Sequence, residues 1–185
     1  LAGRKRPRVL VGGLGLGHTL AAALVGLSSD AEIVVAELSP DVVRWNRGPL
    51  GHLASHPLED PRVHVHVGDV SVLLRGSASV KTRWDAVLLD VDNGPEGLTR
   101  QGNDALYSAR GLAAITQHLR PAGVLGVWSA HESAAFRRRL SGTGLLVEEH
   151  RVRARPAAGA GSKRKRRGGA GKGAHHIVWL ASRAK

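Results

Sequence analysis

The stretch Gly13-Leu14-Gly15-Leu16-Gly17 joins two segments of different pattern and decides how the chain folds. Residues 8–12 before it form a short apolar run, which predicts a strand, and residues 19–27 after it are rich in Ala and Leu, which predicts a helix. Glycines at such a junction let the backbone turn tightly and approach a ligand without Cβ clashes. The order of strand, glycine turn and helix alone fits either a binding loop or a plain strand-helix turn, and it is Glu37, twenty residues after Gly17, that favours the binding loop.

Strands and helices continue to alternate after this unit. Residues 32–37 are rich in β-branched side chains and end in an acid, and Ser39 followed by Pro40 predicts a helix with Ser39 as its N-cap. The later predicted elements are strands at residues 63–67, 85–90 and 123–129, and a helix at residues 107–119. This alternation predicts an α/β fold, in which helices cover both faces of a mainly parallel sheet.

The pattern changes in the last third of the chain. Residues 145–152 and 177–181 predict two further strands that pair with each other in the antiparallel direction, so the sheet should have about seven strands with the last one antiparallel. Residues 153–174 between them consist mostly of Gly, Ala, Lys and Arg. Such a segment has little to bury, so we interpret it as a flexible basic loop.

The composition narrows the class of protein. A length of 185 residues predicts a single domain over residues 1–185. Apolar residues make up 42% of the sequence, and no run reaches the roughly 18 to 20 apolar residues that a membrane span needs. With no secretory signal visible, we expect a cytoplasmic protein. The absence of cysteine excludes disulfides and thiolate metal sites.

The formal net charge of +12 is typical of proteins that bind polyanions, but much of this excess lies in the basic loop. The loop is therefore either a solvated linker or a weak binder of nucleic acid or another polyanion. A homodimer is left open as a further partner.

Acidic residues end the predicted strands on one side of the sheet. Glu37 follows Gly17 by twenty residues, where a carboxylate can accept hydrogen bonds from both hydroxyls of a ribose. Asp69 follows the third strand, and Asp90 and Asp92 follow the fourth. An NAD-binding domain also predicts the glycine loop with Glu37, whereas the acids after the third and fourth strands favour an adenosyl ligand at the carboxyl edge of the sheet.

Several motifs in this order resemble the spermidine synthases, also called polyamine aminopropyltransferases, over nearly the whole chain. Those enzymes are related to the class I S-adenosylmethionine-dependent methyltransferases, and the resemblance implies their Rossmann-like doubly wound sheet. The matching residues are Val9-Leu10-Val11 with Gly13, Gly15, Gly17 and Thr19-Leu20; Val35 through Val43; Asp60-Pro61-Arg62-Val63 leading to Gly68-Asp69; and Trp84 through Asp90 leading to Gly94-Pro95 and Leu106-Tyr107.

The resemblance implies roles for individual residues. Glu37 would hold the ribose, and Asp69 with Val70 would hold the adenine. Asp92 would be the catalytic carboxylate, since an amine must lose a proton to attack the carbon beside a sulfonium. The other implied cofactor-binding residues are Gly13, Gly15, Gly17, Leu38 and Asp90, and the other implied catalytic residues are Asp90 and Tyr107. The co-substrate would be S-adenosylmethionine or its decarboxylated form, the acceptor a small amine or another nucleophile, and no metal is expected.

The chain also departs from that family. Leu16 stands where the family has an aspartate that contacts the aminopropyl cation, and one residue rather than two separates Asp90 from Asp92. The family's N-terminal β-domain has no counterpart in the few residues before the first strand; it was either removed or never present. Methyl transfer from S-adenosylmethionine, and a non-catalytic module that binds a cofactor or nucleic acid, are therefore alternatives to aminopropyl transfer.

Some of these residues have simpler interpretations. Asp69 and Asp90 could cap helices or turns, and Tyr107 could pack in its helix instead of facing a substrate. His64 and His66 share one face of a strand, but no third ligand accompanies them, so we expect no metal there.

Overall fold

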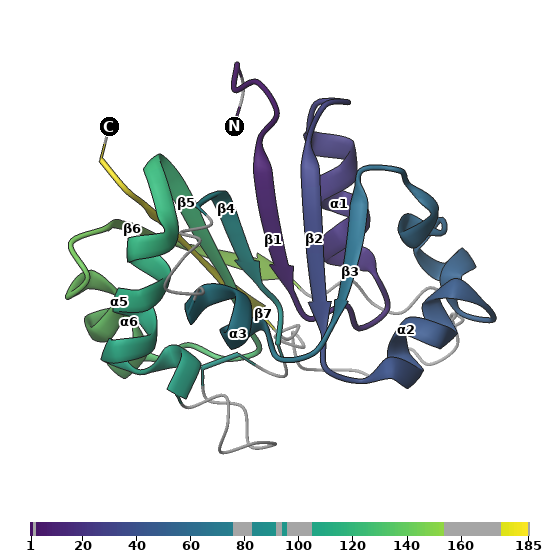
Figure 1. Ribbon diagram of the computed structural model, residues 1–185. Coiled ribbons are helices and arrows are strands. Elements are labelled where there is room, and N and C mark those ends of the chain that lie inside the picture. Colours follow the sequence, from purple (N-terminus) through teal and green to yellow (C-terminus); the bar gives the residue numbers. More distant parts are fainter. Residues whose placement is uncertain (2, 76–82, 92–93, 96–104, 154–174, 185) are drawn as a thin grey trace, which may run out of the picture.

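A computed structural model describes residues 1, 3–75, 83–91, 94–95, 105–153 and 175–184. In this part of the chain, strands form one seven-stranded sheet in the order β3-β2-β1-β4-β5-β7-β6 (Figure 1). The first five strands run parallel, and β7 runs antiparallel to both of its neighbours. The strands are β1 (Arg8–Gly12), β2 (Glu32–Glu37), β3 (Val63–Val67), β4 (Trp84–Leu89), β5 (Leu119–Ser129), β6 (Leu146–Arg153) and β7 (His175–Ser182).

Helices cover both faces of the sheet, and α3, α5 and α6 lie together on one side of it (Figure 1). α1 and α2 pack on the opposite face. The helices are α1 (His18–Gly26), α2 (Pro40–Arg47), α3 (Val70–Arg75), α5 (Ala109–His118) and α6 (Ala134–Ser141), with short 3₁₀ helices η1 (Gly51–Ala54) and η2 (Pro57–Glu59) after α2. Within the described residues, no helix is long and apolar enough to cross a membrane.

The side chains of the central strands alternate between the two faces of the sheet and so divide the core into two halves. In β1, Val9 and Val11 pack with α1 and α2, whereas Leu10 between them packs with the helices of the other face. The same holds for β4, where Ala86 and Val87 belong to opposite halves. Because successive side chains of a strand point to opposite faces, a central strand covered on both sides must be apolar throughout.

The α/β fold with about seven strands, the last of them antiparallel, is confirmed. The predicted strand at residues 63–67 agrees with β3, and Ser39 is the residue that precedes α2, although its side chain makes no capping hydrogen bond. β5 begins at Leu119, earlier than the predicted residue 123. Residue 107 is helical as predicted, but a break at Ser108 separates it from α5, which begins at Ala109. The Ser108 hydroxyl caps α5 by accepting from the Gly111 N–H at 3.1 Å.

The helices α3 and α6 were not predicted from the sequence. α3 has six residues and α6 has eight, including three consecutive arginines, so neither shows a long apolar period. What fixes α6 is its start, where the Ser133 hydroxyl accepts from the Phe136 N–H at 3.0 Å. Of the predicted basic loop, only Arg153 lies inside the described residues, as the end of β6.

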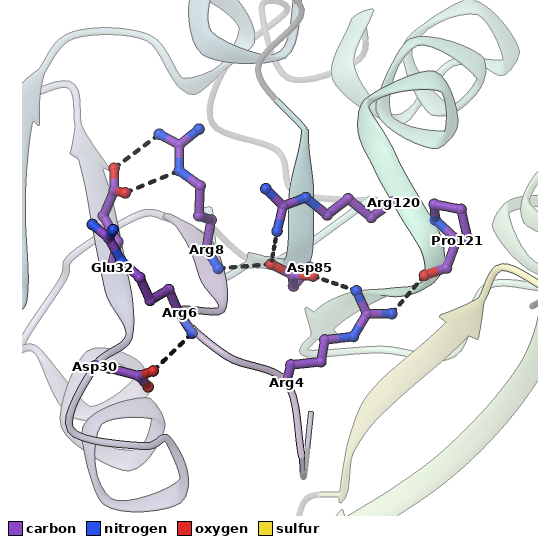
Figure 2. Close-up of polar contacts among 8 residues, drawn as sticks. All are labelled: Arg4, Arg6, Arg8, Asp30, Glu32, Asp85, Arg120 and Pro121. Atoms are coloured by element: carbon purple, nitrogen blue, oxygen red, sulfur yellow. Dashed lines mark hydrogen bonds and ion pairs between the residues drawn. The ribbon is translucent and has the colours of Figure 1, made fainter.

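A buried carboxylate fixes the amino-terminal edge of the sheet (Figure 2). Asp85 in β4 is 1% exposed and forms ion pairs with Arg4 and Arg120, the latter at 2.8 Å. The Asp85 carboxylate also accepts a hydrogen bond from the backbone, since the Arg8 N–H donates to it at 2.8 Å. Asp85 therefore ties the segment before β1 to β4 and β5, on the edge opposite the glycine loop.

A second ion pair lies beside this cluster and involves the side chain of Arg8. Its guanidinium donates to both carboxylate oxygens of Glu32 at 2.8 and 3.1 Å, which joins the first residues of β1 and β2. These hydrogen bonds lower the pKa of Glu32 from its ordinary value.

Candidate cofactor-binding site

The glycine loop leaves β1 at the carboxyl edge of the sheet and passes close to the end of β4. Gly13 has a φ of +89°, and a Cβ placed on it would lie 2.3 Å from the Asp90 carbonyl oxygen. The Gly13 N–H donates to the Ala36 carbonyl at 2.9 Å, which joins the loop to β2 as well. Only glycine fits a position that is both left-handed and this crowded.

The other two glycines of the loop differ in their surroundings. Gly17 has a φ of +84°, and a Cβ there would come within 3.0 Å of Asn46 and Pro57. Gly15 is exposed with a φ of +50°, and no atom lies within 4 Å of where its Cβ would be. Gly13 and Gly17 thus allow the loop to pack, whereas Gly15 presents bare backbone on the open side.

Glu37, the last residue of β2, binds the glycine loop directly. One carboxylate oxygen accepts from the Leu14 N–H at 3.0 Å, and the other accepts from the Ser39 N–H at 2.9 Å. A carboxylate has about four lone-pair sites, so both oxygens keep the capacity to accept a further hydrogen bond. The side chain is half-buried beside the loop.

Asp90, directly after β4, is joined to the start of α1. The Thr19 hydroxyl donates to its carboxylate at 2.6 Å, and the Asp90 N–H donates to the Gly12 carbonyl at 2.8 Å. Hydrogen bonds therefore join the end of β4 both to the end of β1, where the glycine loop begins, and to the start of α1. The two ends of β1 and β4 are also in register, with Gly12 opposite Leu89.

Asp69 and Val70 lie between β3 and α3. Asp69 is exposed and accepts from the Ser71 N–H at 2.7 Å, which is the geometry of a residue that caps a helix. Val70 is 6% exposed, and its side chain lies close to Gly12. A ligand at this position would meet the carboxylate of Asp69 and the backbone of Val70.

Exposed aliphatic side chains surround the acids at this edge. Leu16 in the glycine loop, Leu38 after β2 and Val67 at the end of β3 are 47%, 50% and 52% exposed. Each belongs to a neighbouring segment of the carboxyl edge, since β1, β2 and β3 are adjacent strands. Exposed apolar side chains at this edge could contact the apolar part of an organic ligand.

Of the proposed catalytic residues, Asp90 and Tyr107 lie among the described residues, and Asp92 lies outside them. Tyr107 is 2% exposed, and its ring meets the edge of Phe136 at a centroid distance of 5.6 Å, so its surroundings are those of a core residue. Gly94 has a φ of +85°, and a Cβ there would be 2.7 Å from Ser129, which brings the segment after β4 against the end of β5.

The roles of two residues of the site were not identified from the sequence. Thr19 was matched to the glycine-loop motif, but its role as a donor to Asp90 was missed, because a polar residue at a helix start gives no sign of its partner. Asn46 was missed although it carries a signal. It lies one turn after Val42 and Val43 on α2, where a buried residue is expected to be apolar, and it is 1% exposed.

Metal ligands do not gather in the part of the chain that the structure describes. No group of three His, Asp or Glu side chains there could hold an ion, and His64 and His66 on β3 have no third partner.

Comparison with known proteins places the fold. No model of a known protein family matches the sequence. The curated polyamine aminopropyltransferases of Mycobacterium tuberculosis and Mycobacterium bovis are each 32% identical over 125 residues, which is 68% of this chain. The chain spans only 23% of the length of those proteins.

Solved structures agree with the curated relatives. Spermidine synthase from Thermotoga maritima matches with a TM-score of 0.68 and 17% identity, covering 97% of this chain and 55% of that one. The fold is spermidine-synthase-like. Precorrin-6y C5,15-methyltransferase from Geobacter metallireducens matches with a TM-score of 0.63 and 14% identity, covering 100% of this chain and 84% of that one. The predicted spermidine-synthase resemblance and Rossmann-like class are confirmed at the level of fold.

Proposed function

We propose that the chain binds S-adenosylmethionine or its decarboxylated form and transfers an aminopropyl group to an amine. The observation that carries this proposal is the contact between Glu37 and the glycine loop at the carboxyl edge of a spermidine-synthase-like sheet. One of the solved spermidine synthases is in complex with a transition-state analogue, AdoDATO, and one methyltransferase with the same fold is in complex with SAH.

The residues at this edge fit an adenosyl ligand. The Glu37 carboxylate can accept from both ribose hydroxyls, as acids at the end of the second strand do in dinucleotide-binding domains. Leu38 and Val67 would contact the faces of the adenine, while Asp69 and the backbone of Val70 would meet its polar edge. The exposed Gly15 lets the chain beyond the sulfur pass close to the loop backbone.

Bound there, the donor would supply a carbon that its neighbouring sulfonium makes electrophilic. In aminopropyl transfer from the decarboxylated donor, the C–S bond would break as the new C–N bond forms, and methylthioadenosine would leave as a neutral thioether. The acceptor amine must approach unprotonated, so one proton has to be taken up from the new C–N product. Asp90 and Asp92 are the carboxylates proposed for orienting the amine and accepting that proton. Asp90 already accepts from Thr19, which leaves its second oxygen for this role.

Methyl transfer from S-adenosylmethionine is the second candidate, and Leu16 is the observation that favours it. Its side chain is 47% exposed at the tip of the loop, where an acid would attract the cationic aminopropyl end of the decarboxylated donor. An aliphatic side chain gives no such preference.

The two reactions are separated by mass spectrometry of putrescine and other amines incubated with each donor. Aminopropyl transfer predicts a mass gain with the decarboxylated donor alone, and methyl transfer predicts a gain with S-adenosylmethionine alone. No product with either donor would contradict the enzymatic proposal and leave the non-catalytic alternative.

Other predictions from the sequence stay predictions. They are a single domain over residues 1–185, a cytoplasmic location, a homodimer, and weak polyanion binding by residues 153–174, which beyond Arg153 lie outside the described residues. The loop's two flanking residues, Arg153 and His175, lie opposite each other at the carboxyl edge of the sheet. If residues 153–174 contribute to acceptor binding, we expect that contribution at the same edge of the sheet as the candidate site.

A further inference from the structure

The glycine loop accepts a hydrogen bond from the side chain of Asn46, a residue that has no role in the proposed reaction. Asn46 in α2 is 1% exposed, and its amide nitrogen donates to the Gly15 carbonyl at 2.8 Å and to the Val42 carbonyl at 2.9 Å. Because both partners are carbonyl oxygens, the amide can have only this orientation. The bond to Val42, one turn earlier in the same helix, fixes the side chain while the other bond holds the loop.

Asn46 contacts the loop at a second point as well. A Cβ on Gly17 would lie 3.0 Å from the Asn46 amide oxygen, so the side chain packs directly beneath the residue that precedes α1. That amide oxygen is buried, with no hydrogen-bond partner among the described residues. A leucine of similar size would avoid this unsatisfied acceptor, which indicates that the two donated hydrogen bonds matter at this position.

The contacts of the loop form a continuous chain with the ligand site. Gly13 and Leu14 are bonded to β2 through Ala36 and Glu37, and Gly15 is bonded to α2 through Asn46. β2 and α2 follow each other in sequence, so one strand-helix unit carries Glu37, the acid proposed to bind the ribose, and also the Asn46 side chain that is hydrogen-bonded to Gly15. Gly15 is the one loop glycine whose backbone lies on the open side.

We propose that Asn46 is a positioning residue that holds the glycine loop in the shape that accepts the donor, and thereby sets donor affinity. Its influence on affinity rests on the proposed function, whereas its influence on the loop does not. Without the amide, Gly15 loses its anchor to α2, and the loop has to be ordered when the ligand binds.

The variants for the test are Asn46→Ala and a matched control, Val43→Ala. Val43 is 4% exposed on the same helix and packs in the same core cluster as Leu14 of the loop, but its alkyl side chain donates no hydrogen bond to the loop. Both changes remove a buried side chain from α2, so a general loosening of the helix should affect both alike. Asn46→Ser, which leaves a smaller cavity, serves if the alanine variant does not fold.

Two readouts are needed, on proteins shown to be folded by circular dichroism. Amide hydrogen exchange, without ligand, reports on the bonds from Leu14 to Glu37 and from Gly17 to Leu14. We expect exchange at the Leu14 and Gly17 amides to be at least tenfold faster in Asn46→Ala than in Val43→Ala. Calorimetry should show donor affinity at least tenfold weaker in Asn46→Ala and within threefold of the unmodified protein in Val43→Ala.

Equal exchange and equal affinity in the two variants would overturn the inference, and so would a loss of fold in both Asn46 variants but not in Val43→Ala. If the unmodified protein binds no donor, the proposed function fails and takes the affinity claim with it. The exchange measurement then still decides whether Asn46 holds the loop.

Discussion

The Thr19 hydroxyl donates a 2.6 Å hydrogen bond to the Asp90 carboxylate, and this bond joins the first turn of α1 to the end of β4. Seventy-one positions separate the two residues in sequence. Their contact places the proposed proton acceptor directly beside the glycine loop, so mutations at Thr19 should affect both stability and ligand binding.

Thr19→Val keeps the shape of the side chain and removes its donor. We expect the free energy of unfolding to fall by about 1 to 3 kcal/mol, because a hydrogen bond to a charged group is lost. Urea denaturation measures this. Thr19→Ser retains the hydroxyl and should lose less than half as much. A loss in Thr19→Ser that equals or exceeds the loss in Thr19→Val would contradict the weight given to the hydrogen bond.

Gly13→Ala should destabilise the protein far more than Gly15→Ala. At Gly13 the new Cβ would meet the Asp90 carbonyl oxygen in a left-handed conformation, which should cost about 3 kcal/mol or more. At Gly15 the space is open, and only the conformational cost of about 1 kcal/mol applies. Thermal unfolding of both variants checks the order. Similar losses would mean that the loop does not pack against the end of β4.

Asp85→Ala should strongly destabilise the sheet without touching the ligand site. It leaves Arg4 and Arg120 without their shared buried partner, a change that typically costs about 3 to 5 kcal/mol. Arg44→Ala, which breaks an exposed pair with Asp41, is the control and should change stability by less than about 0.5 kcal/mol. Both values come from urea denaturation, and comparable losses would contradict the role given to burial.

The Glu32 pair predicts a dependence of stability on pH. Hydrogen bonds from Arg8 lower the pKa of Glu32 in the folded protein, so its stabilising contribution is present above the ordinary pKa of glutamate and is lost as pH falls through the lowered pKa. Glu32→Gln should therefore reduce stability at neutral pH, and the difference from the unmodified protein should shrink in acid. Unfolding curves between neutral and acidic pH test this, and a difference that grows in acid would reverse the sign.

The sequence predicted most of the fold because strands such as β1 and β2 contain short apolar runs, at residues 9–11 and 33–36, next to polar or turn residues. It also placed Glu37 and Asp90 at one edge, since the carboxyl ends of parallel strands meet there. It missed α6, whose eight residues include three arginines and depend on the Ser133 cap. Short polar helices form through tertiary packing and capping, which leave little periodic signal.

The candidate site was only partly predictable for a related reason. Acids and glycines at strand ends are visible in a single sequence, but the bonds from Asn46 to Gly15 and from Thr19 to Asp90 join distant segments. Such bonds depend on how α1 and α2 lie in space. The surroundings of Tyr107 also emerged only from the structure, since packing against Phe136 requires α6 to be in place.

The central claim is that Glu37 and the glycine loop bind an adenosyl ligand, and isothermal titration calorimetry tests it most directly. S-adenosylmethionine, its decarboxylated form and methylthioadenosine are titrated into the unmodified protein and into Glu37→Ala. We predict heat of binding with at least one ligand, and a loss of about 1 to 3 kcal/mol in the variant, because the ribose hydroxyls lose their acceptor. Absence of heat with all three ligands, or equal affinity in the two proteins, would contradict the claim.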